Sequence, residues 1–504
     1  MKRLILLYLL LFFSKMNFAQ YSSEIWCFGD SAGIDFTNIN NPIPYYSTMD
    51  SRGSCSSICD SSGSLLFYAF NINTDDSSAF VFDKTHQLMQ NGARLIGAGL
   101  YEEITIVNDP GNSFHFYVFH IGRYTTDGFS YSIVDMNANG GFGSVIQKNV
   151  SLISNTRIAD CVAALKHGNG RDWWIITKLS SYTGSTLNRF LVYLISPTGI
   201  SSPLIQNLGN ATDMDLQRII INNSGSKLMV INFRGFMCEY DFDRCTGIIS
   251  NPNIIFQEQS SSYNRNFWEG AYSPNDSLFY VSLTWYNFSI SDTSRLIQFN
   301  LFDSNISTSG DTLSISKNPI IYGALRLAPD NKIYMASGDN WGTPGYPYPD
   351  SIYTLCNMNL GVINNPDSLG TACNFQPFSF SLGGKRTYVG LPNNPNYELG
   401  AWQGSLCDTL ATGTEDFSDS MLQELTVFYH SGWEIAFINA KYLKGKRYLL
   451  QMWDMTGNIV FKEEGYLRSS YFTKDLNCSG FANGMYLMNL QTEKEMLSRK
   501  IIKN

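Results

Sequence analysis

Short apolar runs alternate with polar turns along most of the chain, a pattern that favours strands over helices. Ala271–Ser282 is the clearest example, because a Ser-Pro-Asn-Asp turn precedes the apolar run Leu278–Val281. Proline presets φ for a turn, and Asn and Asp tolerate its tight conformations. Leu, Phe, Tyr and Val favour a pleated, buried strand. This stretch therefore predicts a β-hairpin.

The same turn unit recurs at intervals of roughly 50 to 60 residues. Its turns are marked by Ser62, Pro110, Asn169, Ser224, Asn275, Asp330 and Asn393. No helical periodicity lies between them, so the spacing predicts the four-stranded blades of an all-β fold, the β-propeller. We expect a seven-bladed propeller, with six or eight blades as alternatives.

Each interval holds a further apolar run for a third strand. These runs are Ala79–Phe82, Phe129–Val134, Phe190–Ile195, Met237–Phe242, Leu296–Phe302 and Ile352–Cys356. The last interval has an inner strand, Thr387–Leu391, with little strand-like sequence after it, whereas Ile25–Gly29 and Gly33–Phe36 precede the first unit. Closing a ring with strands from both termini removes exposed sheet edges. We therefore predict that the strand around Trp26–Gly29 pairs with Thr387–Leu391.

The composition changes after the last repeat. Residues 20–407 form the predicted propeller, and the Thr-, Asp- and Ser-rich stretch 408–420 is a predicted linker. Residues 421–504 contain short alternating strands that predict a small Ig-like β-sandwich. These strands are expected at Leu425–Tyr429, Glu434–Ile438, Arg447–Trp453, Ile459–Glu463, Ser470–Leu476 and Met485–Leu490, before a basic end at Arg499–Lys503.

The N-terminus predicts export. Lys2 and Arg3 precede the apolar run Leu4–Phe13, which indicates a signal peptide over residues 1–19 and a mature chain that begins at Gln20. No later apolar run approaches the length of a transmembrane helix, so no membrane-spanning segment is expected.

Export makes the ten cysteines candidates for disulfides. The predicted pairs are Cys238 with Cys245, Cys356 with Cys373, and Cys55 with Cys59. A metal site at Cys55 and Cys59 is disfavoured, because no second Cys or His pair follows at zinc-site spacing.

Charge and composition limit the kinds of partner that the chain is expected to bind. The formal net charge is −8 and Lys or Arg runs are lacking, which disfavours nucleic acid and anionic membranes. Aromatic residues reach 14% while charged residues make up only 15%, so the chain is folded rather than disordered. Sheet surfaces of this composition suit neutral ligands such as glycans or proteins.

The sequence contains few candidates for catalytic or metal-binding residues. No nucleophile elbow, zinc-protease helix or phosphate loop occurs, and no catalytic residue, metal or cofactor is expected. One carboxylate of the Glu102-Glu103 pair is a candidate to face the channel. Asp213 with Asp215, and Asp241 with Asp243, could each place two carboxylates on one face for calcium or acid/base chemistry, although hairpin capping explains the second pair better.

Recognition is expected in long loops. These loops are Asn71–Ser78, Tyr182–Asn188, Tyr286–Thr293 and Gly338–Pro349. The last one carries the predicted ligand-binding residues Trp341, Tyr346 and Tyr348, whose flat faces can stack on sugars or on protein. The alternative is that this loop folds over its own blade.

Two sets of motifs resemble known families. The stretches Trp26–Phe36, Asp60–Tyr68, His86–Gly92, Asp241–Gly247, Gly390–Asn393 and Leu399–Asp408 resemble exported β-propeller proteins of the phylum Bacteroidetes. Trp453–Gly457, Gly484–Tyr486 and Lys500–Lys503 resemble the type A C-terminal sorting domain of type IX secretion substrates, although its usual Pro-Asn-Pro opening is missing. This resemblance implies a sorting signal that includes Gly484, Tyr486, Lys500 and Lys503, and the type IX machinery as a partner.

Together these features predict a secreted or cell-surface binding or scaffold module without catalytic activity. Its ligand would be a glycan, a matrix component or an envelope protein. The alternative is a secreted carbohydrate-active enzyme with acidic residues at the propeller mouth.

Overall fold

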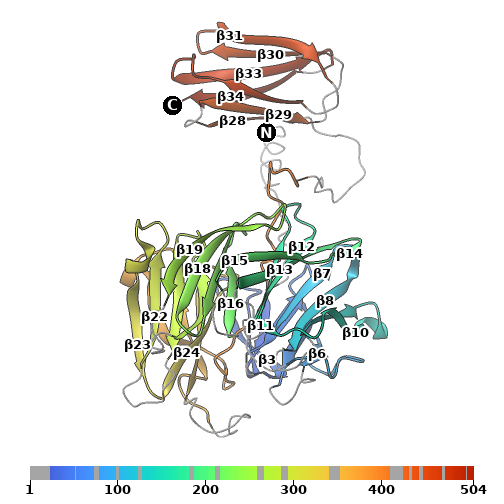
Figure 1. Ribbon diagram of the computed structural model, residues 1–504, viewed down its shortest axis with the longest axis vertical. Coiled ribbons are helices and arrows are strands. Elements are labelled where there is room, and N and C mark those ends of the chain that lie inside the picture. Colours follow the sequence, from blue (N-terminus) through green and yellow to red (C-terminus); the bar gives the residue numbers. More distant parts are fainter. Residues whose placement is uncertain are drawn as a thin grey trace, which may run out of the picture. The chain divides into compact units, whose positions relative to one another are not determined.

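The computed structural model describes residues 23–51, 53–72, 79–97, 102–122, 128–180, 187–210, 216–257, 266–284, 293–339, 352–408, 424–430, 434–441, 447–467, 472–494 and 496–503. It divides into two compact units, Met1–Ala411 and Thr412–Asn504 (Figure 1). The predicted signal peptide lies outside the described residues. Among the described residues, no helix is long and apolar enough to cross a membrane.

The described part of the first unit contains seven antiparallel sheets, the blades of a β-propeller. Six blades begin with an inner strand: β4 (Cys55–Cys59), β7 (Ile104–Asp109), β11 (Ile158–Lys166), β16 (Gln217–Ile221), β20 (Asn266–Tyr272) and β24 (Ile320–Leu327). Each inner strand contacts the inner strand of the next blade. This succession forms the wall of a central channel.

The second and third strands continue each blade outward. The second strands are β5 (Leu65–Asn71), β8 (Asn112–Gly122), β12 (Trp173–Leu179), β17 (Lys227–Asn232), β21 (Leu278–Thr284) and β25 (Ile333–Asp339). The third strands are β6 (Ala79–Asp83), β9 (Gly128–Asp135), β13 (Leu187–Ser196), β18 (Phe236–Phe242), β22 (Thr293–Asn300) and β26 (Asn359–Ile363).

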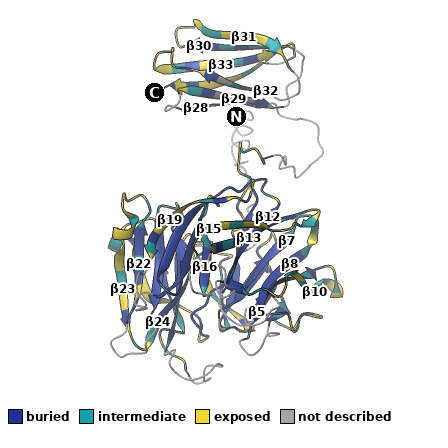
Figure 2. Ribbon diagram, in the orientation of Figure 1, coloured by how far each residue is buried: buried dark blue, intermediate teal, exposed yellow. Residues whose placement is uncertain are grey.

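The outer strands are more exposed. They are β10 (Ser144–Ile153), β15 (Leu204–Asn210) with the short β14 (Gly199–Ile200), β19 (Ile249–Gln257), β23 (Asp311–Lys317) and β27 (Phe375–Ser381). Three 3₁₀ turns, η1 (Asn139–Gly141), η3 (Ile306–Thr308) and η4 (Gly370–Cys373), lie among the described residues of the propeller. Figure 2 shows this difference in exposure within one blade, where the largely exposed β23 lies outside the more buried β22.

The repeated turn explains the regularity of the blades. In the described turns between first and second strands, one Asn or Asp side chain accepts hydrogen bonds from backbone N–H groups two or more residues ahead. Asp60 accepts from Ser62 and Ser64, and Asp330 accepts from Lys332. This local bond lets a short polar sequence reverse the chain between two apolar strands.

The remaining blade closes the ring. It contains β1 (Ile25–Phe28), β2 (Asp30–Asp35) and β3 (Ile43–Asp50), with β2 between the other two. Asp30 forms a single antiparallel bridge with Arg386, and its N–H donates to the Arg386 carbonyl at 2.9 Å. The chain that follows Arg386 therefore takes the innermost place of this blade.

The predicted ladder between Trp26–Gly29 and Thr387–Leu391 does not form. The Thr387 N–H donates to the Asn357 carbonyl, and the Val389 carbonyl accepts from Ala324 of β24. Val389 also has a φ of 73°, which interrupts an extended strand. The two segments are neighbours, but one bridge replaces the predicted pairing.

Two other predicted elements are wrong. Ile352–Cys356 is not a strand, because Asn357 bonds both the Ile352 carbonyl and the Thr354 N–H and holds the segment as a turn before β26. Asn393 does not turn a hairpin but lies among the inner strands, as described below.

The second unit contains two sheets that form a β-sandwich. One sheet consists of β28 (Glu424–His430), β29 (Ile435–Lys441) and β32 (Phe472–Asn477), and the other of β31 (Ile459–Tyr466), β30 (Arg447–Asp454), β33 (Gly484–Thr492) and β34 (Met496–Lys503). Ile438 from the first sheet and Met452 and Met488 from the second share one core. The basic end of the chain, where the sequence predicts no strand, belongs to β34. Its side chains alternate as in a strand, since Ile501 and Lys503 point inward while Lys500 and Ile502 point outward.

We predict that deletion of residues 20–40 lowers the melting temperature of the propeller. The deletion removes β1 and β2, and with them the buried side chains of Trp26, Phe28 and Ile34. Deletion of residues 414–504 is the control, and should leave this melting temperature nearly unchanged while blocking export. Thermal denaturation of both truncated proteins tests this, and an unchanged transition after the N-terminal deletion would contradict it.

Candidate functional site

The channel of the propeller is crossed by the chain itself. We call Arg386–Leu399 the central strap. It passes so close to the wall that a side chain at Gly29 would collide with the Arg386 carbonyl, and one at Gly323 with the Val389 carbonyl. Glycine at these two positions permits the approach.

Asn393 lies at the centre of the strap contacts. Its side-chain amide donates to the carbonyls of Ile104 on β7 and Val162 on β11, at 3.1 and 2.8 Å. Its N–H donates to the Cys55 carbonyl of β4 at 2.8 Å. One residue thus bonds the inner strands of three consecutive blades, which fixes both the strap and the wall.

The neighbouring strap residues extend these contacts. The Asn394 side chain accepts from the Ser57 N–H at 2.9 Å, and the Tyr397 hydroxyl donates to the Ile106 carbonyl at 2.8 Å. On the other side, Arg326 of β24 donates to the Pro392 carbonyl at 2.9 Å.

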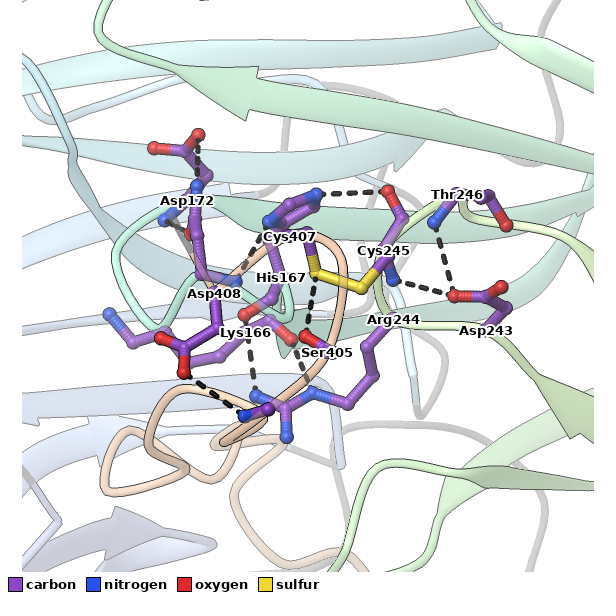
Figure 3. Close-up of a disulfide and its surroundings, with 12 residues drawn as sticks. Lys166, His167, Asp172, Asp243, Arg244, Cys245, Thr246, Ser405, Cys407 and Asp408 are labelled. Atoms are coloured by element: carbon purple, nitrogen blue, oxygen red, sulfur yellow. Dashed lines mark hydrogen bonds between the residues drawn. A yellow bond between two sulfur atoms is a disulfide. The ribbon is translucent and has the colours of Figure 1, made fainter. Parts of the chain in front are cut away.

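A disulfide holds the far end of this segment. Cys407 is bonded to Cys245, which lies in the hairpin between β18 and β19 (Figure 3). Arg244 donates to the carbonyls of Lys166 and Gly400, and His167 lies beside the Cys245 carbonyl at 3.1 Å. The bridge therefore fastens the segment after the strap to the hairpin between β18 and β19, and Arg244 links this hairpin to the β11–β12 hairpin of the preceding blade.

The three predicted disulfide pairs are not formed. Cys55, Cys59, Cys238, Cys356 and Cys373 are free and buried. Cys238 lies within β18, because the sequence expected to fold back continues that strand to Phe242. Cys55 and Cys59 lie on one strand, where four residues of rise separate them by about 13 Å, too far for a bridge.

A network of five buried charged side chains lines the channel. Arg218 of β16 contacts Asp160 of β11 and Glu269 of β20, each at 3.2 Å. Arg326 of β24 contacts Glu269 at 3.1 Å and also pairs with Glu102. Acidic and basic groups thus alternate across neighbouring blades.

The charges of this network balance only if one acid is protonated. Two arginines face three carboxyl groups. Burial raises the pKa of Glu102 to about 8; Arg326 opposes this shift and the nearby Glu269 adds to it. Burial in this network therefore favours the protonated form of Glu102 at neutral pH.

Next to this network lies a cavity of about 540 Å³. Its wall contains Glu102, Glu269 and Arg326, together with Pro392–Asn396 of the strap. Residues of the hairpin turns, including Asn222, Pro274 and Pro329, also line it, so the cavity reaches the face of the ring where the first strands end. We call it the axial cavity.

The predicted site residues have different outcomes. Trp341, Tyr346 and Tyr348 lie outside the described residues, as do Asp213 and Asp215. Glu102 faces the channel as one of the Glu102-Glu103 pair was expected to, whereas Glu103 accepts a bond from Asn71 at 2.7 Å.

The Asp241 and Asp243 pair serves the hairpin. Asp241 bonds Lys227 and Asn251, and Asp243 accepts from the N–H groups of Cys245 and Thr246.

Sequence reasoning missed the two arginines of the channel. A signal was present, because four successive inner strands each carry a charged residue within a mainly apolar run. These residues are Asp160, Arg218, Glu269 and Arg326.

The residues of the predicted sorting signal lie together in the second unit. Gly484 is opposite Lys503 and Tyr486 is opposite Ile501 in the β33–β34 pair, while Lys500 faces Leu487. The buried Lys503 ammonium donates to the carbonyls of Cys478 and Phe481, each at 2.8 Å, and lies 3.3 Å from Glu434. Lys503 therefore also stabilises the end of the sandwich.

Comparison with known families identifies this unit. Residues 434–504 match the family of secretion system C-terminal sorting domains. The match supports export by the type IX machinery to the cell surface or the extracellular space. No curated protein matches the chain significantly.

Solved structures similar to this chain are distant. The Dos1 propeller is 12% identical with a TM-score of 0.39, over 71% of this chain and 82% of that one. The β-propeller domain of Myceliophteria thermophila Cps50 (Swd1) is 10% identical with a TM-score of 0.34, over 63% and 93%. The periplasmic gluconolactonase PpgL of Pseudomonas aeruginosa is 9% identical with a TM-score of 0.34, over 81% and 97%.

We predict that Arg326→Met destabilises the propeller by about 3–5 kcal/mol, because Asp160 and Glu269 then share the single buried guanidinium of Arg218 and Glu102 loses its partner. Urea denaturation measures the loss. Arg295→Met, at an exposed position of β22, is the matched control and should change stability little.

Glu102→Gln separates charge from packing in the same experiment. Because the folded-state pKa of Glu102 is raised, its contribution to the free energy of unfolding is complete at low pH and is lost as the pH rises through about 8. Glu102→Gln should therefore gain stability relative to the wild type between pH 5 and pH 8. A constant difference across this range would contradict the assigned protonation.

We also predict that the double variant Cys245→Ser/Cys407→Ser is about 2–4 kcal/mol less stable, since the bridge closes a long loop with a sequence separation of 162. Urea denaturation with and without dithiothreitol tests this. The reductant should lower the wild type to the level of the variant and leave the variant unchanged. Equal sensitivity of both proteins would show that a different disulfide matters.

Proposed function

We propose that this protein is a non-catalytic binding module of the cell surface or the extracellular space. Its ligand is a glycan, a matrix component or an envelope protein. The observation that carries the proposal is that the channel acids Asp160 and Glu269 already bind Arg218 and Arg326. Glu269 lies between two buried guanidinium groups and Asp160 against one, and a carboxylate held in this way is poorly suited to take up a proton or to attack a substrate.

The arrangement of the strands favours recognition at one face. In each blade the second strand ends, and the third begins, at the face where the inner strands start. The loops at Asn71–Ser78, Tyr182–Asn188, Tyr286–Thr293 and Gly338–Pro349 all make this connection between second and third strands. Loops on a rigid scaffold are common carriers of binding residues, and the sequence between β25 and β26 contains Trp341, Tyr346 and Tyr348.

We predict that Trp341→Ala/Tyr346→Ala/Tyr348→Ala weakens ligand binding at least tenfold, because it removes three stacking surfaces. The secreted wild type is first screened on a glycan array and on isolated envelope proteins, and the best ligand is then titrated. The control is Phe302→Ala/Trp402→Ala/Tyr466→Ala, which removes three exposed aromatic side chains elsewhere. Equal affinity of the first variant and the wild type would exclude this loop.

One observation favours the alternative function of a carbohydrate-active enzyme. Glu102 lies on the wall of the axial cavity and, with a pKa of about 8, keeps a proton that a general acid could donate. A reducing-sugar assay on the glycans that bind best separates the two functions. Release of sugar by the wild type but not by Glu102→Gln would support the enzyme, whereas the binding module releases none.

A further inference from the structure

The axial cavity is lined by a buried carboxyl group, that of Glu24, one oxygen of which has no hydrogen-bond partner among the described residues. Glu24 lines this cavity and only 6% of the residue is exposed. Its Oε2 atom has no hydrogen-bond partner among the described residues. Its stem packs against Gly63 in the first hairpin turn, so the side chain is held at the wall. A buried polar atom without a partner is costly, and its presence beside a cavity indicates a missing ligand.

The charges around Glu24 increase this imbalance. The charged groups that act on it most strongly are Glu398 of the central strap and Asp35 of β2, and both are acidic. Cys59 of β4 faces it as a buried thiol. The nearby cation, Lys166, acts on Glu398 and Asp172, with its ammonium 4.0 Å from the centre of the Trp173 ring.

The described residues of the cavity wall do not supply a counter-ion to Glu24. Arg326 is the basic residue of the described wall, and it is already bound to Glu102 and Glu269. The excess negative charge of the cavity therefore lies at its Glu24 end.

We propose that the axial cavity binds an organic cation, a protonated amine or a guanidinium group, through the carboxylate of Glu24 with Glu398 beside it. The volume of about 540 Å³ lies in the range of small-molecule sites. Trp26 and Leu399 provide apolar surface for the body of the ligand. This inference rests on the proposed binding function and names a ligand class for a second position on the ring.

Proton release should accompany binding. Burial, with smaller effects of Glu398 and Asp35, raises the pKa of Glu24 to about 7. A bound cation favours the ionised carboxylate, so affinity should rise roughly tenfold from pH 6 to pH 8. Lys166, whose pKa burial lowers to about 8, also titrates near this range and opposes cations when charged.

The experiment is calorimetric titration of the full-length secreted protein with agmatine and putrescine at pH 6 and pH 8. The control ligand is 1,4-butanediol, which has the length of putrescine without its charge. The cations should bind and the diol should not. Glu24→Gln should weaken binding at least tenfold and remove the part of the pH dependence that Glu24 causes.

The matched control variant is Glu464→Gln, which removes one exposed carboxylate from the other unit and should bind like the wild type. Melting curves of both variants confirm folding. If Glu24→Gln does not fold, Glu398→Gln is titrated instead and should weaken binding in the same direction. Equal binding of the diol, unchanged affinity of the variants, or stronger binding of Ca²⁺ than of the amines would overturn the proposal.

Two titrations distinguish a small-molecule cation from a lysine side chain of a protein partner. The peptide acetyl-Gly-Lys-Gly-amide is compared with its Gln analogue, because a lysine side chain of a protein partner offers the same ammonium as a free amine. Binding of the lysine peptide assigns a protein partner, and binding of the free amines alone assigns a small molecule. If the loop face binds its ligand and no cation enters the cavity, this inference fails and the proposed function stands.

Discussion

The central strap is the contact on which the propeller depends. A ring of sheets must join its first and last blades, and here the joint is not a full ladder but a chain segment laid along the channel wall. Asn393 alone bonds the inner strands β4, β7 and β11, and Val389 bonds β24. These strands are far apart in sequence, so the strap carries much of the long-range order of the ring.

The charge network sets a second constraint. Inner strands bury their side chains, so a charged residue there needs a partner from a neighbouring blade. Arg218 and Arg326 provide these partners for Asp160 and Glu269, and the surplus acid Glu102 keeps a proton. The network therefore couples five blades electrostatically. Glu24 differs from Glu102, because no arginine of the described wall contacts it. Glu24 is therefore the better candidate to bind a cation, although both acids line the same cavity.

The sequence predicted the parts of the fold that depend on local chemistry. The Asx turns and the strands beside them followed from short patterns, since Asp60 or Asp330 bonds within a few residues of itself. The strap could not be predicted in this way, because Thr387–Leu391 has strand-like composition and only its distant partners Asn357 and Ala324 divert its backbone groups. The same holds for Cys407, whose partner is 162 residues away. The charged residues of the inner strands can be found in the sequence repeats. Which of them form ion pairs follows only from the three-dimensional structure.

The disulfide lies between the strap and the C-terminal unit along the chain. Cys407 lies just before the boundary of the first unit, and the sorting domain begins beyond it. Because Cys245 fixes Cys407 to the hairpin between β18 and β19, the chain is tied to a blade between Asn393 and the C-terminal unit. Disulfides persist in the oxidising conditions outside the cytoplasm, and the sorting domain also acts outside the cytoplasm.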